Sequence, residues 1–221
     1  MSLTLALETS SGRFAVAVGR DDAVLYNSLA DCEKGPERDL AWAVRRALDQ
    51  AGAAPTDLSR LVVDIGPGGL GSVRGGVTFA NALAFALSLP IAAFNYFEIV
   101  AHEAGPLDRP LLVALPAAGG DGYAGLIRAG QVVGMRFGPL GEIMRQAAGE
   151  APALAVAGRL RGRLGEFLPD VERTDTGIEA PDPASLLALV RLHPDRVGAP
   201  GQPVEPLNET SPVFHGGVFH D

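Results

Sequence analysis

The sequence has little of several features that mark other classes of protein. Its one cysteine, Cys32, cannot form an internal disulfide. No apolar run reaches the length of a membrane span, and the opening segment MSLTLALETSSG contains neither a basic leader nor an apolar stretch long enough for a signal peptide. From these absences we expect a cytoplasmic protein.

Positive charge is also scarce. The chain has 18 Lys and Arg against 26 Asp and Glu, which gives a formal net charge of −8. Because nucleic-acid affinity depends on clustered Lys and Arg, we expect the chain alone to bind RNA weakly or not at all. Arginines do gather at Arg159, Arg161 and Arg163, but so short a group is more typical of a solvated face.

The length and the apolar content are those of an ordered globular protein. With 221 residues, of which 47% are hydrophobic and 20% charged, the chain can bury a substantial core. One large domain or two smaller ones are both possible at this length. The order of the predicted elements decides between them.

Residues 61–90 are the stretch around which the first half is organised. The apolar run at residues 61–65 predicts a buried strand, the glycine-rich stretch 66–76 a tight loop, and residues 77–89 a helix. This helix is apolar on nearly every face, so it needs cover on two sides. We expect one side of the helix to pack on its own sheet and part of the opposite side to pack on a partner.

The glycine-rich stretch admits several interpretations. It fits the three-glycine dinucleotide pattern, but residues 72–97 contain no Asp or Glu to hold a ribose. It lacks the Gly-Lys-Ser or Gly-Lys-Thr ending of a triphosphatase loop, and Arg74 is the one cation nearby. Two interpretations stay open: a sharp structural turn into a closely packed helix, or a loop that faces a nucleotide or a partner.

A meander followed by alternating helices and strands is expected in the first half. The elements predicted there, besides the stretch just described, are strands at residues 3–7, 14–18 and 23–28, a helix at about 37–51, a strand at 90–94 and a helix at 97–103. Trp42 lies off the core face of the helix at 37–51. It either covers a domain edge or meets a partner.

The pattern then begins again. Four pairs of residues match without gaps at one constant spacing, namely Leu3 with Leu111, Leu7 with Leu115, Gly12 with Gly120, and Val18 with Leu126. Self-similarity at so long a period indicates two related domains. We expect an N-terminal domain at residues 1–105 and a smaller C-terminal domain at 106–221, irregular from about residue 197. The second copy is predicted to contain strands at 111–115, 123–127, 132–137 and 153–157, and helices at 141–148 and 183–192.

Two copies of this pattern make the duplicated α/β architecture of actin-like proteins, in which the first turn of each copy holds phosphate and metal. The candidates for a degenerate nucleotide site are Glu8, Thr9, Ser10, Gly68, Gly69 and Arg74. A phosphotransferase of this fold needs acidic side chains on both first turns to position magnesium. Glu8 supplies one, but the position that matches it in the second copy is Pro116.

Several segments resemble the TsaB (YeaZ) family. They are residues 5–10 (LALETS), 66–76 (GPGGLGSVRGG), 89–91 (LPI) and 111–115 (LLVAL), with Tyr123, and the resemblance covers most of residues 1–127. TsaB pairs with TsaD to make the threonylcarbamoyl modification of the adenosine next to the tRNA anticodon. The resemblance implies an actin-like (ASKHA) fold and a non-catalytic subunit. It also implies a TsaD-like catalytic partner, a TsaE-like ATPase as a further partner, and a homodimer when alone.

Whether the chain resembles TsaB or TsaD decides whether a metal site and a cofactor are expected. The TsaD family carries two metal-binding histidines four residues apart, where this chain has Tyr96 and Val100. His102 and Glu103 are no replacement, because the second histidine of a His-Glu-x-x-His site would fall at Pro106. The resemblance therefore implies no metal, no catalytic residue and no cofactor of its own, with ATP or ADP held at an interface of the complex.

In the family, the two helices of the first domain pack against TsaD or against a second copy. The resemblance places the partner interface on these two helices, and the residues that we assign to it are Leu40, Trp42, Val77, Ala80 and Ala84, with the outward positions of the second helix chosen from periodicity. The chain departs from the family pattern at Glu37 and Arg38, at residues 116–118 and at residues 207–209. Two other functions stay open: a stand-alone ATPase, kinase or metallopeptidase-like enzyme, and a homodimeric structural protein.

Overall fold

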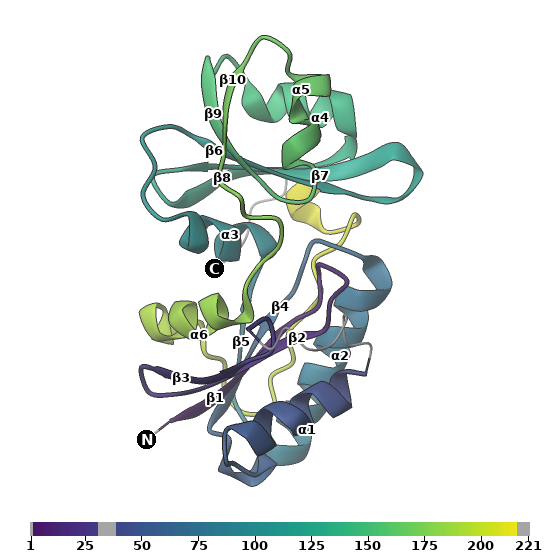
Figure 1. Cartoon of the computed structure of the whole chain (residues 1–221). Coiled ribbons are helices and arrows are strands. Elements are labelled where there is room, and N and C mark those ends of the chain that lie inside the picture. Colours follow the sequence, from purple (N-terminus) through teal and green to yellow (C-terminus); the bar gives the residue numbers. More distant parts are fainter. Residues whose placement is uncertain (1, 31–38, 216–221) are drawn as a thin grey trace. The chain divides into compact units, whose positions relative to one another are not determined.

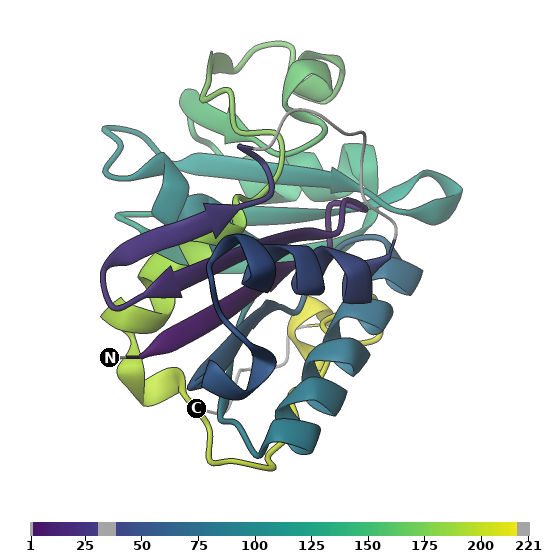
Figure 2. The same cartoon turned by 60° about the horizontal axis from the view of Figure 1, so that its bottom comes forward.

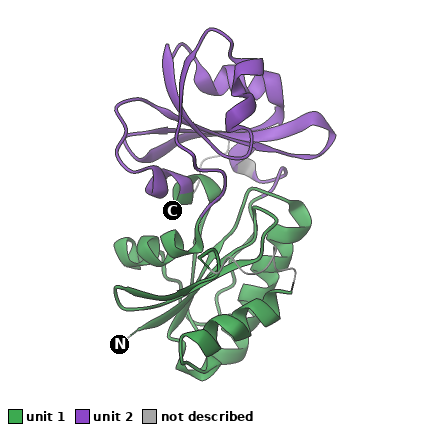
Figure 3. Cartoon of the chain, in the orientation of Figure 1, with its two compact units in different colours: residues 1–99, 182–207 green, residues 100–181, 208–221 purple. Residues whose placement is uncertain are grey.

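The computed structural model describes residues 2–30 and 39–215, which form two compact units (Figures 1 and 3). The first unit comprises residues 1–99 and 182–207, and the second comprises residues 100–181 and 208–221. This division differs from the predicted boundary between residues 105 and 106, because residues 182–207 return to the first unit. Cys32, Glu37 and Arg38 lie outside the described residues.

The first unit is built on a five-stranded mixed sheet with the order β3-β2-β1-β4-β5. Its strands are β1 (Leu3–Glu8), β2 (Ala15–Arg20), β3 (Ala23–Asn27), β4 (Arg60–Asp64) and β5 (Ile91–Phe94). The first three form an antiparallel meander, and β4 and β5 run parallel to β1. The helices are α1 (Leu40–Gln50), α2 (Leu70–Leu87), α3 (Tyr96–Ala104), through which the chain passes to the second unit, and α6 (Pro183–Leu192).

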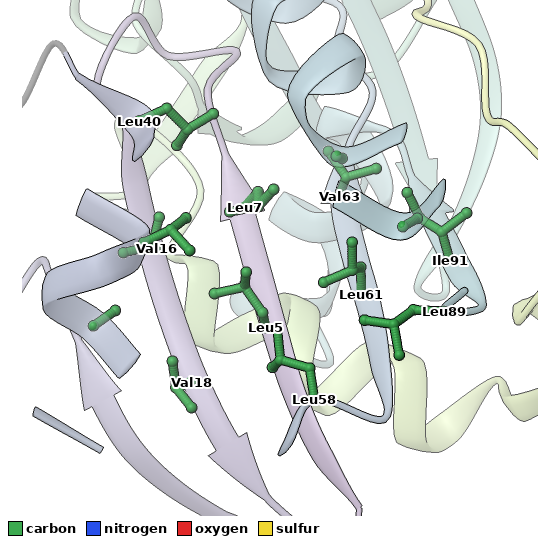
Figure 4. Close-up of a cluster of buried hydrophobic side chains, with 14 of the residues drawn as sticks. Leu5, Leu7, Val16, Val18, Leu40, Leu58, Leu61, Val63, Leu89 and Ile91 are labelled. Atoms are coloured by element: carbon green, nitrogen blue, oxygen red, sulfur yellow. The ribbon is translucent and has the colours of Figure 1, made fainter. Parts of the chain in front are cut away.

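The sheet of the first unit is covered on both faces. Figures 1 and 2 show α1 and α2 side by side on one face and α6 on the other. Because successive side chains of a strand alternate between faces, each strand contributes to both layers. The α1 and α2 layer, drawn in Figure 4, includes Leu5, Leu7, Val16, Val18, Leu61 and Val63. The α6 layer includes Ala6, Ala17, Val62, Leu186, Leu187 and Val190.

The helix α2 begins at Leu70, whereas the sequence predicted its start at Val77. The additional turns contain three glycines, which are poor helix formers. One of them is required by packing, because a Cβ at Gly76 would overlap the side chain of Thr9 on the adjoining turn. The close approach of the chain at Thr9 therefore outweighs the weak helix propensity of this segment.

By length and composition α2 could also cross a membrane, against the expectation that no apolar run is that long. It has 18 residues, and its inward face is buried in the first unit. That face consists of Val73, Gly76, Val77, Ala80 and Ala84. These side chains pack against the sheet of the first unit, so α2 is a helix of this unit with one buried side and one exposed side.

The helix α6 and its following segment pack on the first unit, although the sequence placed this helix in the second copy. Asp182 caps α6 as predicted, and its carboxylate accepts a hydrogen bond from the amide of Ala184 at 2.8 Å. Beyond α6 the chain stays on the same unit, where the amide of Leu207 donates to the carbonyl of Ile65 at 2.7 Å. Hydrophobic periodicity found this helix but could not show which sheet it covers.

The second unit repeats the first. Its sheet has the order β10-β9-β6-β7-β8, which corresponds strand by strand to β5-β4-β1-β2-β3. Its elements are β6 (Leu111–Pro116), β7 (Asp121–Arg128), β8 (Gln131–Pro139), α4 (Leu140–Ala148), β9 (Ala153–Ala157), α5 (Leu164–Phe167) and β10 (Glu172–Asp175). The duplicated actin-like α/β fold is confirmed. The sequence missed α5 and β10: both have only four residues, and β10 is polar throughout.

The ungapped match between the two copies, which pairs Leu3 with Leu111, aligns β2 with β7 correctly. It misaligns β1 with β6 by one residue. In the first unit, Leu5 and Leu7 of β1 and Val16 and Val18 of β2 face α1 and α2. In the second unit, Leu112 and Ala114 of β6 and Ala124 and Leu126 of β7 face α4. The second strands therefore keep the predicted spacing, but on the first strands Leu5 corresponds to Leu112 rather than to Val113. Since a one-residue slip turns every side chain to the other face, the counterpart of Glu8 is the buried Leu115 and not the exposed Pro116.

Candidate functional site

Two carboxylates lie at the carboxyl ends of neighbouring parallel strands in the first unit. Glu8 ends β1 and Asp64 ends β4. By the alternation along the strands, both side chains point to the same face as Ala6 and Val62. Both are fully buried. Buried acids are rare unless their oxygens are bonded, so their contacts define the site.

The hydroxyl of Ser10 lies between the two acids. Its Oγ is 2.9 Å from Oε1 of Glu8 and also contacts Oδ2 of Asp64. Ser11 binds Glu8 as well, its amide donating to Oε1 at 2.8 Å and its hydroxyl to Oε2 at 2.7 Å. Oδ1 of Asp64 accepts the amide of Gly66 at 2.7 Å. The turn after β1 and the turn after β4 are thus joined through one hydroxyl.

Burial governs the protonation of both acids. It raises the pKa of Glu8 above its usual value, although hydrogen bonds from Ser11 and Ser10 act in the opposite direction. Burial also raises the pKa of Asp64 well above its usual value, and the nearby Glu8 carboxylate raises it further. Because both acids are buried and contact one hydroxyl, ionisation of one disfavours ionisation of the other.

The glycine loop, residues 66–69, packs directly on this turn. The amide of Gly69 donates to the carbonyl of Ser10 at 3.2 Å, and a Cβ at Gly68 would overlap the backbone of Ser10. Gly66 has a φ of +94°, which favours glycine, and precedes a cis peptide bond to Pro67. These contacts support the structural interpretation of the loop, a sharp turn into a closely packed helix.

The structure brings together four of the six residues predicted for a degenerate nucleotide site: Glu8, Ser10, Gly68 and Gly69. Thr9 points the other way, toward Gly76 of α2, and its buried hydroxyl has no hydrogen bond among the described residues. Arg74 is exposed on α2 and takes no part in the network, as far as the described residues go.

Asp64 is the site residue that sequence reasoning missed. The run at residues 61–65 was interpreted as continuous and apolar, yet its fourth position is an acid. A charged residue inside a strand that is otherwise buried is itself a signal, because such a residue needs a dedicated partner. That signal was present in the sequence.

This arrangement does not fit the metal of a bound nucleotide. The oxygens of Glu8 and Asp64 are buried and occupied by hydrogen bonds from Ser10, Ser11 and Gly66. The second unit offers no acid at the matching place, whether Leu115 or Pro116 is compared. Within residues 2–30 and 39–215, no three His, Cys, Asp or Glu side chains are grouped so that they could hold a metal ion.

The outer sides of α1 and α2 expose large apolar side chains. Phe85 is 79% exposed, Trp42 41% and Leu70 39%. The guanidinium of Arg46 lies over the Trp42 ring at 5.3 Å from its centroid. We call the outward sides of α1 and α2, which carry Trp42, Leu70 and Phe85, the α1–α2 face.

Most of the predicted partner-interface residues are not on this face. Leu40, Val77, Ala80 and Ala84 are all buried in the core of the first unit. Leu40 lies on the core stripe of α1. Val77, Ala80 and Ala84 lie on the buried side of α2, which periodicity does not identify because this helix is apolar around its circumference. Trp42 is the one predicted residue that is exposed.

Two of the three arginines at 159–163 are paired with acids, which agrees with a solvated face. Arg163 pairs with Glu166 at 2.7 Å, and Arg161 pairs with Asp175 at 3.3 Å. These are exposed acids of the second unit. The group therefore offers little unbalanced positive charge to a phosphate backbone.

Comparisons with known proteins identify the family. The family model described as "TsaD: tRNA N6-adenosine threonylcarbamoyltransferase" matches residues 33–157. The tRNA threonylcarbamoyladenosine biosynthesis protein TsaB of Bacillus subtilis is 34% identical over 122 residues, which are 55% of this chain and 53% of that protein. The tRNA N6-adenosine threonylcarbamoyltransferase of Geotalea uraniireducens is 31% identical over 168 residues, 67% of this chain and 48% of that protein.

A solved structure extends the likeness over nearly the whole chain. The Pseudomonas aeruginosa protein described as similar to peptidase YeaZ aligns with a TM-score of 0.73 and 25% identity, covering 94% of this chain and 99% of that one. The chain spans about half the length of the curated relatives it matches. Together these matches show that the chain belongs to the TsaD family and, within it, to the TsaB (YeaZ) proteins.

Proposed function

We propose that the chain is a non-catalytic, TsaB-like subunit that acts in the cytoplasm in the threonylcarbamoyl modification of tRNA adenosine. Its role there is to bind a TsaD-like catalytic subunit. The observation that carries the proposal is the α1–α2 face, where Phe85, Trp42 and Leu70 are exposed. The similarity to the tRNA threonylcarbamoyladenosine biosynthesis protein TsaB of Bacillus subtilis supports the pathway.

The residues at the expected metal positions support a non-catalytic role. In the resemblance to TsaD, the metal histidines correspond to Tyr96 and Val100, and both side chains are fully buried here. Valine has no atom that coordinates a metal, and a buried tyrosine does not replace the histidine pair. This counts against the stand-alone metallopeptidase. The occupied, buried Glu8 and Asp64 count against a stand-alone ATPase or kinase.

The α1–α2 face has the character of a helix-packing surface. The outward residues of α2 are mostly small, namely Gly71, Gly75, Thr78, Ala82 and Ala86. Small side chains let a partner helix approach closely, and exposed aromatic side chains are typical anchors of protein interfaces. A partner helix would therefore lie along α2, with Phe85 and Trp42 as its main contacts.

The other components belong to the assembled complex. We place ATP or ADP and a TsaE-like ATPase there rather than on this chain alone. In the absence of TsaD, a second copy of the chain uses the same face. One surface that serves both assemblies makes the homodimer and the heterodimer mutually exclusive.

The test is a charge on the α1–α2 face. Phe85→Glu should dissociate the homodimer and reduce co-purification with a TsaD-like subunit by about 30-fold or more, the range of an interface hot spot. The matched control is Leu192→Glu at the end of α6, which is 63% exposed but lies on the opposite side of the same sheet. Light scattering measures the homodimer, co-purification the heterodimer, and circular dichroism the fold.

The two variants separate the possible outcomes. If Leu192→Glu disrupts assembly as strongly as Phe85→Glu, the α1–α2 face is not the interface. If a folded Phe85→Glu loses the homodimer and keeps the TsaD-like subunit in full, the two assemblies use different surfaces. Retention of both assemblies by Phe85→Glu contradicts the proposal itself.

A further inference from the structure

The contacts of Ser10 limit where hydrogens can be. Its hydroxyl carries one hydrogen, yet its Oγ lies within hydrogen-bonding distance of two buried carboxyl groups, Glu8 and Asp64. If both acids were ionised, one contact would bring two oxygens together with no hydrogen between them. One of the two acids must therefore carry a proton of its own.

The remaining contacts show which acid it is. Both oxygens of Glu8 accept hydrogen bonds from Ser11, one from the amide and one from the hydroxyl. Glu8 is thus surrounded by donors, as an ionised carboxylate requires. On Asp64, Oδ1 accepts the amide of Gly66, and Oδ2 meets Ser10 alone. A hydrogen on Oδ2 of Asp64 completes the network with one hydrogen in each contact.

We propose that Asp64 is a neutral carboxylic acid in the folded protein at neutral pH, donating to Ser10, which in turn donates to the Glu8 carboxylate. Loss of this proton as the pH rises then loosens the glycine loop and the first turn of α2. The Asp64–Ser10–Glu8 network is thus a proton-dependent contact that holds the turn after β1 to the turn after β4. This inference stands independently of the proposed partner.

The charges around the pair agree with this assignment. Arg13, in the turn after β1, favours the ionised form of Glu8. Glu98 at the start of α3 disfavours ionisation of Asp64 and is itself paired with Arg196 at 3.2 Å. Burial and the charge of Glu8 both raise the pKa of Asp64 well above its usual value. Two like charges this close in a buried site cannot both form without large cost.

The consequence reaches the glycine loop because the same residues hold it. Asp64 binds the amide of Gly66, and the carbonyl of Ser10 accepts the amide of Gly69. Ionisation of Asp64 brings its Oδ2 and Oε1 of Glu8 into repulsion across Ser10. The least costly relief is to move Ser10, and the glycine loop moves with it.

The pH dependence of unfolding tests the proposal. The folded pKa of Asp64 is raised, so the stability it provides is full below the unfolded pKa of about 4 and is lost as the pH rises through the folded pKa. In that interval the unfolding constant should rise about tenfold per pH unit for the one proton released. Urea unfolding between pH 5 and pH 9 measures this.

The decisive variant is Asp64→Asn. Its amide oxygen still accepts Gly66 and its NH2 still donates to Ser10, so the network is kept without an ionisable group. We expect the pH dependence to flatten by about one proton, and the variant to be more stable than the wild type at pH 9. Asp49→Asn, on the exposed side of α1, is the matched control and should leave the slope unchanged.

Two results would contradict the proposal that Asp64 is neutral. One is an Asp64→Asn variant that keeps the wild-type slope, and the other is an Asp64 carboxyl carbon that NMR shows to be ionised at pH 7. The NMR titration is made on the wild type, so it decides the matter even if a variant folds poorly. Hydrogen exchange at the amides of Gly66 and Gly69 should accelerate more than its intrinsic pH dependence requires, with the midpoint of the Asp64 titration. Exchange that follows only the intrinsic pH dependence would exclude the loosening of the loop.

Discussion

The two units of this chain have the same strand order but differ at the ends of their central strands. In the first unit, β1 and β4 end in Glu8 and Asp64 with Ser10 between them. In the second unit, the counterpart of Glu8 is Leu115, and β9 (Ala153–Ala157) contains no acid. Since the fold forms without these acids, they are an addition that the first unit tolerates because its turn supplies hydroxyl donors.

The helices after the second parallel strand differ as well. In the first unit α2 has 18 residues, and in the second unit the corresponding α5 has 4. The long helix exposes Phe85 near its C-terminal end. The α1–α2 face therefore exists in the unit that kept the long helix. The same duplicated fold thus carries a candidate interface in one copy and not in the other.

The largest effect is expected from placing an acid in the second unit. Leu115→Glu puts a carboxylate at the counterpart of Glu8, where the following residues 116–120 are PAAGG and supply no hydroxyl. An uncompensated buried charge costs about 3 to 5 kcal/mol. We expect that loss at pH 7 and a smaller one at pH 5, because protonation removes the charge. Urea unfolding at both pH values measures it.

The control for this variant is Leu115→Met, which keeps the volume and should cost less than about 1.5 kcal/mol. If Leu115→Glu is no less stable than Leu115→Met at pH 7, the second unit accepts an acid without special donors. The contrast between the two units would then lose its physical basis.

A smaller effect is expected from the two loops that follow the second parallel strand. Gly68→Ala forces a Cβ into the backbone of Ser10, and overpacking of this kind costs about 1 to 3 kcal/mol. Gly162→Ala, in the corresponding part of the second unit, meets no atom within 4 Å and should change stability by less than about 0.5 kcal/mol. Thermal unfolding compares them. Equal losses would mean that the close approach of Gly68 to the backbone of Ser10 does not limit this position.

The smallest effect concerns the hydroxyl–carboxylate contact of the second unit, where Tyr123 donates to Oε2 of Glu209 at 3.2 Å. Tyr123→Phe removes it at a cost of about 0.5 to 1.5 kcal/mol. Burial, followed by the charge of Glu209, raises the pKa of Tyr123 to about 12.

The sign of the Tyr123 effect follows from the raised pKa. The contact stabilises fully below the usual tyrosine pKa of about 10 and is lost as the pH rises through about 12. The wild type should therefore lose stability between pH 10 and pH 12 more steeply than Tyr123→Phe. Parallel curves for the two proteins over that interval would show that Glu209 does not stabilise the phenol.

Local pattern was sufficient for most elements of the fold. Short apolar runs bounded by turns located the strands, and Asp182 with Pro183 located the start of α6. The internal repeat showed the duplication, but its alignment was one position out on the first strands. A strand that is buried on both faces has no polar alternation to fix its phase, so Leu111, Leu112 and Val113 look alike in sequence.

The candidate site was predicted in part for a similar reason. Glu8, Ser10 and the glycines were found because they follow apolar strands at turns. Asp64 was missed, since the apolar residues around it concealed an acid whose partner, Ser10, lies far away along the chain. No local pattern records that Ser10 faces two carboxyl groups.

The sequence by itself determined what depends on neighbours along the chain: the strands, the helix caps, the duplication and the family. Tertiary structure alone decided what depends on contacts across the chain. It placed α6 on the first sheet, turned Ala80 and Ala84 of α2 inward, and brought Glu8 and Asp64 to one hydroxyl. Periodicity specifies that a helix or strand has a buried side, but which side and against which sheet follows only from the packing that removes the most apolar surface from water.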